Sequence, residues 1–351
     1  MLEAKVFHKT LHFKHPAGTS RGVYRTRDCH FVMIKSMDTG QVGFGECSPL
    51  PALSCDDVPN YTHILEEAAK AIASTGILNR ERLLDFPSIL FGLECALLNM
   101  LNDSPVLFES PFTRAEESIE INGLIWMGTF EEMYTRIREK LDQGYRCLKL
   151  KIGAIDFEKE IELLRFVRKN FSADLIELRV DANGAFSPLD APEKLKRLSE
   201  FSIHSIEQPI RAGQWEEMAH LCENSPIPIA LDEELIGINR AGEKRKLLDT
   251  IRPQYIILKP TLHGAISGAQ EWIKDAEERR IGWWATSALE SNIGLSAIAQ
   301  WTSSLHPKMP QGLGTGALYT DNIEMPLKIE HGRLHYIPQK EVPNILDWLL
   351  A

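Results

Sequence analysis

LIELRVDANG, residues Leu175–Gly184, is an apolar run that ends in a carboxylate, Asp181, followed by small and polar residues. The same pattern recurs in SIEQP, ALDEE and LKP, where the runs end at Glu207, Asp232 and Lys259. Successive ends are 25 to 27 residues apart, which is the length of one strand followed by one helix. This spacing predicts βαβ units and therefore a parallel sheet.

Similar units begin near residue 117 and continue to about residue 285. Amphipathic helical patterns separate the apolar runs, for example Phe130–Gln143, Phe157–Asn170, Ala191–Glu200 and Ser267–Arg280. Seven or eight such units fit a TIM-type barrel better than an open doubly wound sheet. The predicted barrel strands are Ile119–Ile125, Arg146–Ile152, Leu175–Val180, Ser202–Ile206, Ile227–Leu231, Tyr255–Leu258 and Gly282–Ala285.

The N-terminal part has strands first and helices afterwards, which is typical of an α+β domain. Strands are predicted over Lys5–Phe13, Cys29–Ser36 and Val42–Glu46, and helices over Asn60–Ser74 and Ser88–Met100. A hairpin is predicted within Met325–Ile337. We expect an α/β fold, a TIM-type (β/α)7β barrel over residues 111–320. An α+β capping domain is expected over residues 1–110, with a C-terminal segment, 321–351, that returns to the cap.

Composition excludes several classes of function. The 351 residues carry a net charge of −10, which argues against nucleic acid or an anionic membrane surface as a general partner. No apolar run approaches the roughly 18 residues of a membrane span, and the N-terminus has no signal-type core. The six cysteines form no CxxC pair, which favours reduced thiols over zinc or disulfides. We expect a cytoplasmic enzyme with a small-molecule substrate, and its oligomeric state stays open.

Three of the strand-end residues are carboxylates: Asp181, Glu207 and Asp232. In a barrel they share the C-terminal rim, where that fold places its chemistry. Buried charge is costly unless it is paired or binds a metal, and an all-oxygen set suits Mg²⁺ before Mn²⁺. Each acid taken alone could instead be a helix N-cap or a surface residue, but the constant spacing of all three favours a metal site.

Lysines flank these carboxylates. Lys149 and Lys151 are two residues apart on a strand, so both side chains point to the same face. Like charges that are partly desolvated depress each other's pKa, as a lysine base requires. Lys259 would face them across the barrel mouth. A metal between opposed lysines suits removal of a proton next to a carboxylate.

Two loops near the end of the barrel are candidates for contact with an anionic ligand. Thr286–Asn292 follows a strand and opens a helix, so its hydroxyls and N–H groups suit a carboxylate, although simple N-capping explains it equally well. Gly312–Gly316 falls at the eighth-strand position, where its backbone N–H groups could approach the substrate. A dinucleotide site there is weakly supported, because the glycines do not lie between an early strand and helix.

The strand-end lysines and carboxylates together resemble the site of the enolase superfamily, in the subgroup of muconate-lactonizing enzymes. They are Lys149, Lys151, Asp181, Glu207, Asp232 and Lys259. The resemblance implies that the acids hold Mg²⁺ against a substrate carboxylate and that Lys151 removes the α-proton. It also implies that Lys149 lowers the pKa of Lys151 and that Lys259 lies over the opposite face of the ring. Asn183 would support the metal site.

Within this subgroup the chain is most similar to the branch that dehydrates 2-succinyl-6-hydroxy-2,4-cyclohexadiene-1-carboxylate to o-succinylbenzoate for menaquinone. The similar segments are Pro16–Gly22, Gly45–Leu50, Ser287–Ser291 and Gly312–Thr315. The first two are cap segments, which in this superfamily close over the site. The resemblance implies a set of substrate-binding residues, namely Ser20, Arg21, Ser287, Glu290 and Gly314.

Other functions stay open at this point. Branches with the same lysines and metal racemise N-acylamino acids, epimerise dipeptides or cycloisomerise muconate. An epimerase should carry an acidic motif just past the eighth strand; Gly312–Gly316 lacks one, although Asp321 follows closely. A non-catalytic barrel should have lost a member of the set, and a metal-dependent hydrolase would need histidines at strand ends.

Overall fold

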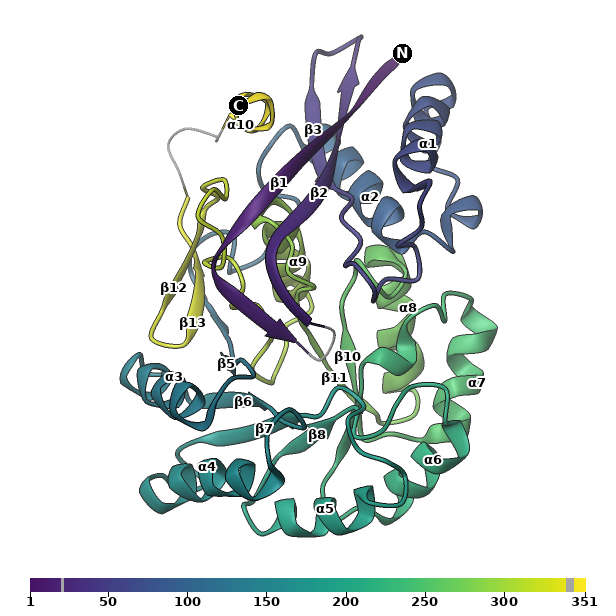
Figure 1. The fold of residues 1–351 in the computed structure, drawn as a ribbon. Helices are drawn as coiled ribbons and strands as arrows, with labels where there is room; N and C mark the ends of the chain where they lie inside the picture. The colour runs from purple at the N-terminus through teal and green to yellow at the C-terminus, as the bar shows by residue number, and fades with distance from the viewer. Residues whose placement is uncertain (20–21, 339–343) are drawn as a thin grey trace.

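The structure is a computed structural model that describes residues 1–19, 22–338 and 344–351. Within these residues, seven parallel strands form the central sheet in the order β11-β10-β9-β8-β7-β6-β5. The sheet curls, and helices cover its outside (Figure 1). The strands are β5 (Gly123–Ile125), β6 (Cys147–Lys151), β7 (Glu177–Asp181), β8 (Ser205–Glu207), β9 (Ile229–Leu231), β10 (Tyr255–Leu258) and β11 (Gly282–Ala285).

Two residues close the sheet between its end strands. The Gln311 carbonyl accepts from the N–H of Asn122, the residue before β5, at 2.9 Å, and the Gly312 N–H donates to the carbonyl of Ala285, the last residue of β11, at 2.8 Å. A Cβ atom on Gly312 would lie 2.2 Å from the Thr286 hydroxyl, so this approach requires glycine. The predicted (β/α)7β barrel is confirmed, with residues 311–312 at the eighth strand position.

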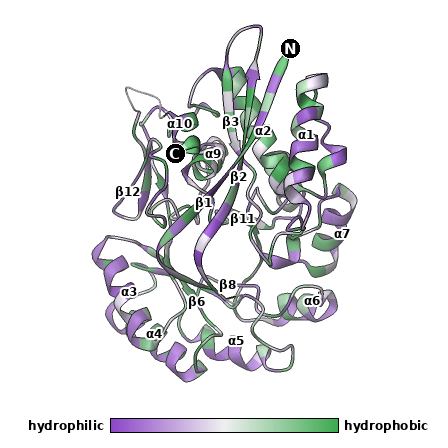
Figure 2. Ribbon diagram, turned by 45° about the horizontal axis from the view of Figure 1, so that its top comes forward, coloured by the Kyte–Doolittle hydropathy of each residue, from purple (hydrophilic) through white to green (hydrophobic). Residues whose placement is uncertain are grey.

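The helices outside the barrel pack their apolar faces on the sheet, and Figure 2 shows hydrophilic and hydrophobic residues side by side along each. In α4 the buried residues Ile161, Leu164 and Val167 recur at helical spacing. The helices are α3 (Phe130–Asp142), α4 (Phe157–Asn170), α5 (Ala191–Ser199), α6 (Trp215–Asn224), α7 (Ala241–Ile251), α8 (Ala265–Glu277) and α9 (Asn292–Ser304). Each of the four predicted helical segments overlaps one of these helices, and the prediction Ser267–Arg280 runs past the end of α8 at Glu277.

The N-terminal part forms a cap beside the barrel. An antiparallel sheet, β1 (Leu2–Thr19), β2 (Gly22–Ser36) and β3 (Val42–Glu46), packs against α1 (Tyr61–Thr75) and α2 (Pro87–Asn102). The backbones of β3 and α2 nearly touch, since a Cβ atom on Gly45 would lie 1.9 Å from the carbonyl oxygen of Gly92. The lower parts of strands β1 and β2 reach over the mouth of the barrel (Figure 1).

One predicted strand is wrong. Ile119–Ile125 is two strands, because the pairing partner changes within it. β4 (Ile119–Glu120) pairs antiparallel with β13 (Arg333–Tyr336), which itself pairs with β12 (Leu327–Glu330), whereas β5 belongs to the barrel.

The C-terminal helix α10 (Ile345–Leu350) lies on the cap sheet. Lys9 of β1 donates to the Trp348 carbonyl at 2.8 Å, and the Trp348 ring lies 5.5 Å from that of Phe31. The domain limits at residues 110 and 320 stay predictions. In the described part of the chain, no helix has the length and apolar character needed to cross a bilayer. The six cysteines are free, and five of them are buried.

Candidate active site

The predicted strand-end residues lie side by side on the barrel rim. Adjacent strands pair in register, so that Lys151 of β6 lies opposite Asp181 of β7, and Asp181 lies opposite Glu207 of β8. Asp232 follows directly after β9 and Lys259 directly after β10. The order of strands therefore places the three acids between the Lys149–Lys151 pair and Lys259, as the spacing predicted.

The two lysines of β6 contact the carboxylates directly. The Lys149 ammonium lies 2.9 Å from Asp181 Oδ2 and also pairs with Glu207. The Lys151 ammonium donates to Asp181 Oδ2 at 2.6 Å and to Asn183 Oδ1 at 2.8 Å. Asn183 has a positive φ of 44°, a conformation that asparagine tolerates better than most residues, and it follows the strand end closely enough to reach Lys151.

These contacts decide the charge state of Lys149. Burial alone lowers the pKa of Lys149, but the carboxylates of Asp181 and Glu207 outweigh burial and raise that pKa well above its ordinary value. In this structure the carboxylates thus set the direction of the shift in the Lys149 pKa, and the effect of Lys149 on Lys151 stays a prediction. The physical reason is that the Lys149 ammonium is in direct contact with two carboxylates, those of Asp181 and Glu207. These contacts could not be read from the sequence alone.

Lys259 holds the other end of the row. Its ammonium pairs with Asp232, and its backbone N–H donates to Nδ1 of the buried His263 at 3.0 Å. Burial lowers the pKa of Lys259, and the carboxylates of Asp232, Glu207 and Glu233 together more than reverse that effect, so the pKa is raised. The side chain is thus held as a cation facing the site.

The carboxylates fit a divalent cation in chemistry, although no group of three His, Cys, Asp or Glu side chains is gathered as a metal cluster among the described residues. Ammonium groups lie between the acids instead. Burial, followed by the negative charge of Asp181, raises the pKa of Glu207 well above its ordinary value. Glu207 Oε1 and Asp232 Oδ1 are buried and have no hydrogen-bond partner in the described part of the chain. Such orphaned oxygens in an all-carboxylate set match the ligands that Mg²⁺ prefers.

A cavity of about 930 Å³ lies over this row. The barrel contributes Lys149, Lys151, Lys259 and Asn183 to its lining, and the cap contributes residues 14–17, 23–24, 50 and 53. Both cap segments that carried the resemblance thus reach the cavity. The lining also includes Glu233, which sequence reasoning missed. The Glu233 carboxylate accepts a hydrogen bond from Asn183 Nδ2 at 2.9 Å. Its position directly after Asp232 in the segment ALDEE could have marked it as a site residue.

Of the predicted substrate-binding residues, two line the cavity and one does not. Ser287 and Gly314 line the cavity, and the hydroxyls of Ser287 and Thr315 lie 2.5 Å apart. Glu290 does not line it; its carboxylate accepts hydrogen bonds from the Thr261 hydroxyl and, at 2.7 Å, from the Ala288 N–H. Its placement as a substrate ligand is thus not supported, because the side chain turns into the protein. Ser20 and Arg21 lie outside the described residues.

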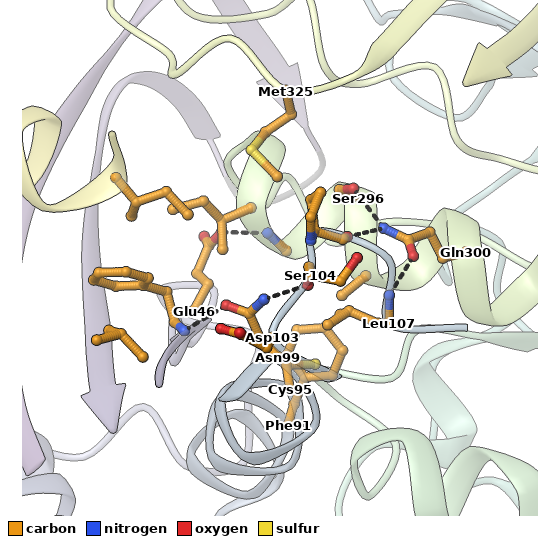
Figure 3. Close-up of a pocket in the computed structure, with 17 residues that line it drawn as sticks. Glu46, Phe91, Cys95, Asn99, Asp103, Ser104, Leu107, Ser296, Gln300 and Met325 are labelled. Atoms are coloured by element: carbon orange, nitrogen blue, oxygen red, sulfur yellow. Dashed lines mark hydrogen bonds between the residues drawn. The ribbon is translucent and has the colours of Figure 1, made fainter. Parts of the chain in front are cut away.

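A second cavity, of about 210 Å³, lies between β3, α2 and α9 (Figure 3). It shares no lining residue with the larger cavity. Among its lining residues, the Asn99 side chain accepts from the Phe44 N–H at 2.9 Å and donates to the Ser104 carbonyl at 2.8 Å. None of the lysines and carboxylates at the ends of the barrel strands lines this smaller cavity.

Comparisons with known proteins agree with this architecture. The family model described as "MenC, N-terminal domain" matches residues 1–100, and "Enolase C-terminal domain-like" matches residues 132–341. The o-succinylbenzoate synthase of Desulfotalea psychrophila is 49% identical, over 92% of this chain and 95% of that one. The crystal structure of MenC from the same organism matches with a TM-score of 0.84 and 45% identity, over 95% of this chain and 99% of that one. An L-Ala-D/L-Glu epimerase of Bacillus subtilis is 25% identical, over 81% and 79% of the two chains.

A barrel with lysines and carboxylates at its strand ends is the arrangement of the enolase superfamily, whose sites use a lysine or histidine base with one or two Mg²⁺ ions. The chain belongs to this superfamily and, within it, to the o-succinylbenzoate synthase family.

Proposed function

We propose that this chain is a Mg²⁺-dependent dehydratase that converts 2-succinyl-6-hydroxy-2,4-cyclohexadiene-1-carboxylate to o-succinylbenzoate in menaquinone biosynthesis. The observation that carries the proposal is the buried row in which Lys151 and Lys259 flank three carboxylates under a cavity that the cap closes. A cytoplasmic location is part of the same proposal.

Asp181, Glu207 and Asp232 are the residues that would hold Mg²⁺, and Mn²⁺ suits the same oxygens. When bound, the cation supplies positive charge for the ring carboxylate of the substrate and for the negative charge that develops beside it. Asn183 supports this site by holding Lys151 on one side and Glu233 on the other.

Lys151 is the proposed base. Its neutral amine takes the proton from the ring carbon that carries the carboxylate, and the electrons of that C–H bond move into the ring. The C–O bond of the neighbouring hydroxyl then breaks, and Lys151 returns the proton to the departing oxygen, which leaves as water. Proton removal and return on one face give a syn elimination, and the product ring is aromatic.

Lys149 and Lys259 act through their charge. Lys149 lies between Asp181 and Glu207, where it offsets their repulsion and fixes the carboxylates beside Lys151. Lys259, on the far side of the row, places a cation over the opposite face of the ring, where it stabilises the anionic intermediate. Ser287 and Gly314 line the cavity as binding groups for the substrate.

The alternatives are an N-acylamino acid racemase, a dipeptide epimerase or a muconate cycloisomerase of the same subgroup. An epimerase should carry an acidic motif for the amino group of its substrate just past the eighth strand. The acid that follows the eighth strand, Asp321, is engaged elsewhere: it accepts from the His12 N–H at 2.9 Å and lies 2.8 Å from His12 Nδ1. It does not line the cavity, which favours the dehydratase.

The test compares two reactions of the same enzyme preparation. Loss of the diene absorbance is followed with Mg²⁺ and with EDTA, and polarimetry follows racemisation of N-succinylamino acids. Fast, metal-dependent loss of the diene with slow racemisation is the expected result. Efficient racemisation with little dehydration would move the chain to the racemase branch.

A further inference from the structure

The strand β1 is interrupted where it passes the cavity. His12 pairs with Thr26 and Ala17 pairs with Tyr24, so that residues 13–16 stand opposite the single residue Arg25. This is a bulge, a feature that often turns side chains toward an active site. Residues 13–16 therefore have no pairing partner on β2.

The bulged residues contact the barrel rather than β2. Phe13 forms a bridge with Tyr319, and their ring centroids lie 4.6 Å apart. The Lys14 N–H donates to the Leu318 carbonyl at 2.8 Å. Leu318 lines the cavity, as do Lys14 and His15. The bulge thus fixes Lys14 at the edge of the active-site cavity, on a segment held through Phe13 and through the Lys14 N–H itself.

Lys14 also differs from the other lysines and arginines of this cavity. Lys149, Lys151 and Lys259 are paired with carboxylates. Arg136 donates to the Trp126 and Met127 carbonyls, and the Lys140 ammonium lies 4.7 Å from the centre of the Tyr145 ring. Three glutamates of α3, Glu131, Glu132 and Glu139, line the cavity as well, yet the Lys14 ammonium has no ion pair or hydrogen bond with any described residue. It is available for an anion that enters from outside.

The proposed substrate has two carboxylates. The metal and the lysines at the barrel strand ends would bind only the one on the ring. We propose that Lys14 binds the second carboxylate, at the end of the succinyl side chain, and so acts as a specificity-determining residue. This assignment rests on the proposed function. A charged hydrogen bond of this kind contributes about tenfold to hundredfold in affinity.

The experiment uses Lys14→Met, which keeps the length of the side chain and removes its charge, and Lys14→Arg, which restores a charge. Lys308→Met is the matched control, because Lys308 is exposed and does not line the cavity. Calorimetry measures binding of o-succinylbenzoate and of its analogue in which the succinyl carboxylate is an amide. Steady-state kinetics on the diene substrate give KM and kcat for each variant.

Lys14→Met is expected to weaken o-succinylbenzoate binding and to raise KM by about tenfold to hundredfold, with kcat within a few-fold of wild type. The same variant should bind the amide as wild type does, Lys14→Arg should recover most of the loss, and Lys308→Met should match wild type. Equal binding of the diacid by Lys14→Met and Lys308→Met would overturn the assignment. Lys14→Gln gives a second reading if the methionine variant folds poorly. Failure of the wild-type enzyme to consume the diene would overturn the proposed function instead.

Discussion

Glu46, the last residue of β3, accepts hydrogen bonds from both the N–H of Ser291, at 3.0 Å, and the Ser291 hydroxyl, at 2.6 Å. A third bond comes from the Gly294 N–H at 3.1 Å (Figure 3). A fully buried carboxylate of the cap thus sits at the N-terminus of the barrel helix α9, where the helix dipole favours negative charge. This contact ties the cap to the loop that carries Ser287.

Replacement of Glu46 by glutamine should destabilise the protein. The amide presents a donor to groups that are themselves donors, so at least one buried N–H or O–H loses its partner. The expected loss in free energy of unfolding is about 1–3 kcal/mol, measured by urea denaturation. Glu66→Gln, on the exposed side of α1, is the matched control and should change stability little. Equal stability of the two variants would show that Glu46 does not hold cap and barrel together.

Stability should depend on pH through Asp56. Burial raises the pKa of this carboxyl from 3.8 to about 6, despite hydrogen bonds from the Ser88 N–H and hydroxyl. Between about pH 4 and pH 6 the folded state therefore binds more protons than the unfolded state. The contribution of Asp56 to the free energy of unfolding is therefore fully present below about pH 4, and it is lost as the pH rises through about 6.

The comparison of wild type with Asp56→Asn isolates this effect, because other groups titrate alike in both proteins. From pH 4 to pH 7, wild type should lose roughly 2–3 kcal/mol in free energy of unfolding relative to the variant. Urea denaturation at several pH values measures the difference. A difference that stays constant across this range would contradict the raised pKa.

Asp232→Asn should weaken metal binding and turnover together. Mg²⁺ affinity, measured by calorimetry, should fall at least about tenfold, since removal of a residue that merely orients a metal ligand already costs that much. Asp174→Asn, on an exposed turn, serves as the control. Unchanged Mg²⁺ affinity in Asp232→Asn would remove this residue from the proposed ligand set.

The sequence predicted the barrel and its charged row because both depend on a local period. One strand and one helix repeat every 25 to 27 residues, and the residue that ends each strand is visible in the sequence. In-register pairing of parallel strands then brings Lys151, Asp181 and Glu207 together without any further information.

Features that depend on distant contacts were not predictable in this way. Nothing near Glu46 in the sequence marks it as the partner of Ser291, 245 residues away. The division of Ile119–Ile125 follows from pairing with β13, some 210 residues later. Glu290 was expected at the substrate because the segment Ser287–Ser291 resembles the family, but its carboxylate bonds to Thr261 and to the Ala288 N–H instead.

The central claim is that Lys151 removes a proton beside a metal held by Asp181, Glu207 and Asp232. The most direct test strips the enzyme with EDTA and follows the rate of diene loss as Mg²⁺ is added back. Wild type and the surface control Lys159→Ala should recover activity along one saturable curve. Lys151→Ala should bind Mg²⁺ in calorimetry yet stay at least about a hundredfold slower at saturation. Turnover by the stripped wild-type enzyme, or recovery by Lys151→Ala to the wild-type rate, would contradict the account.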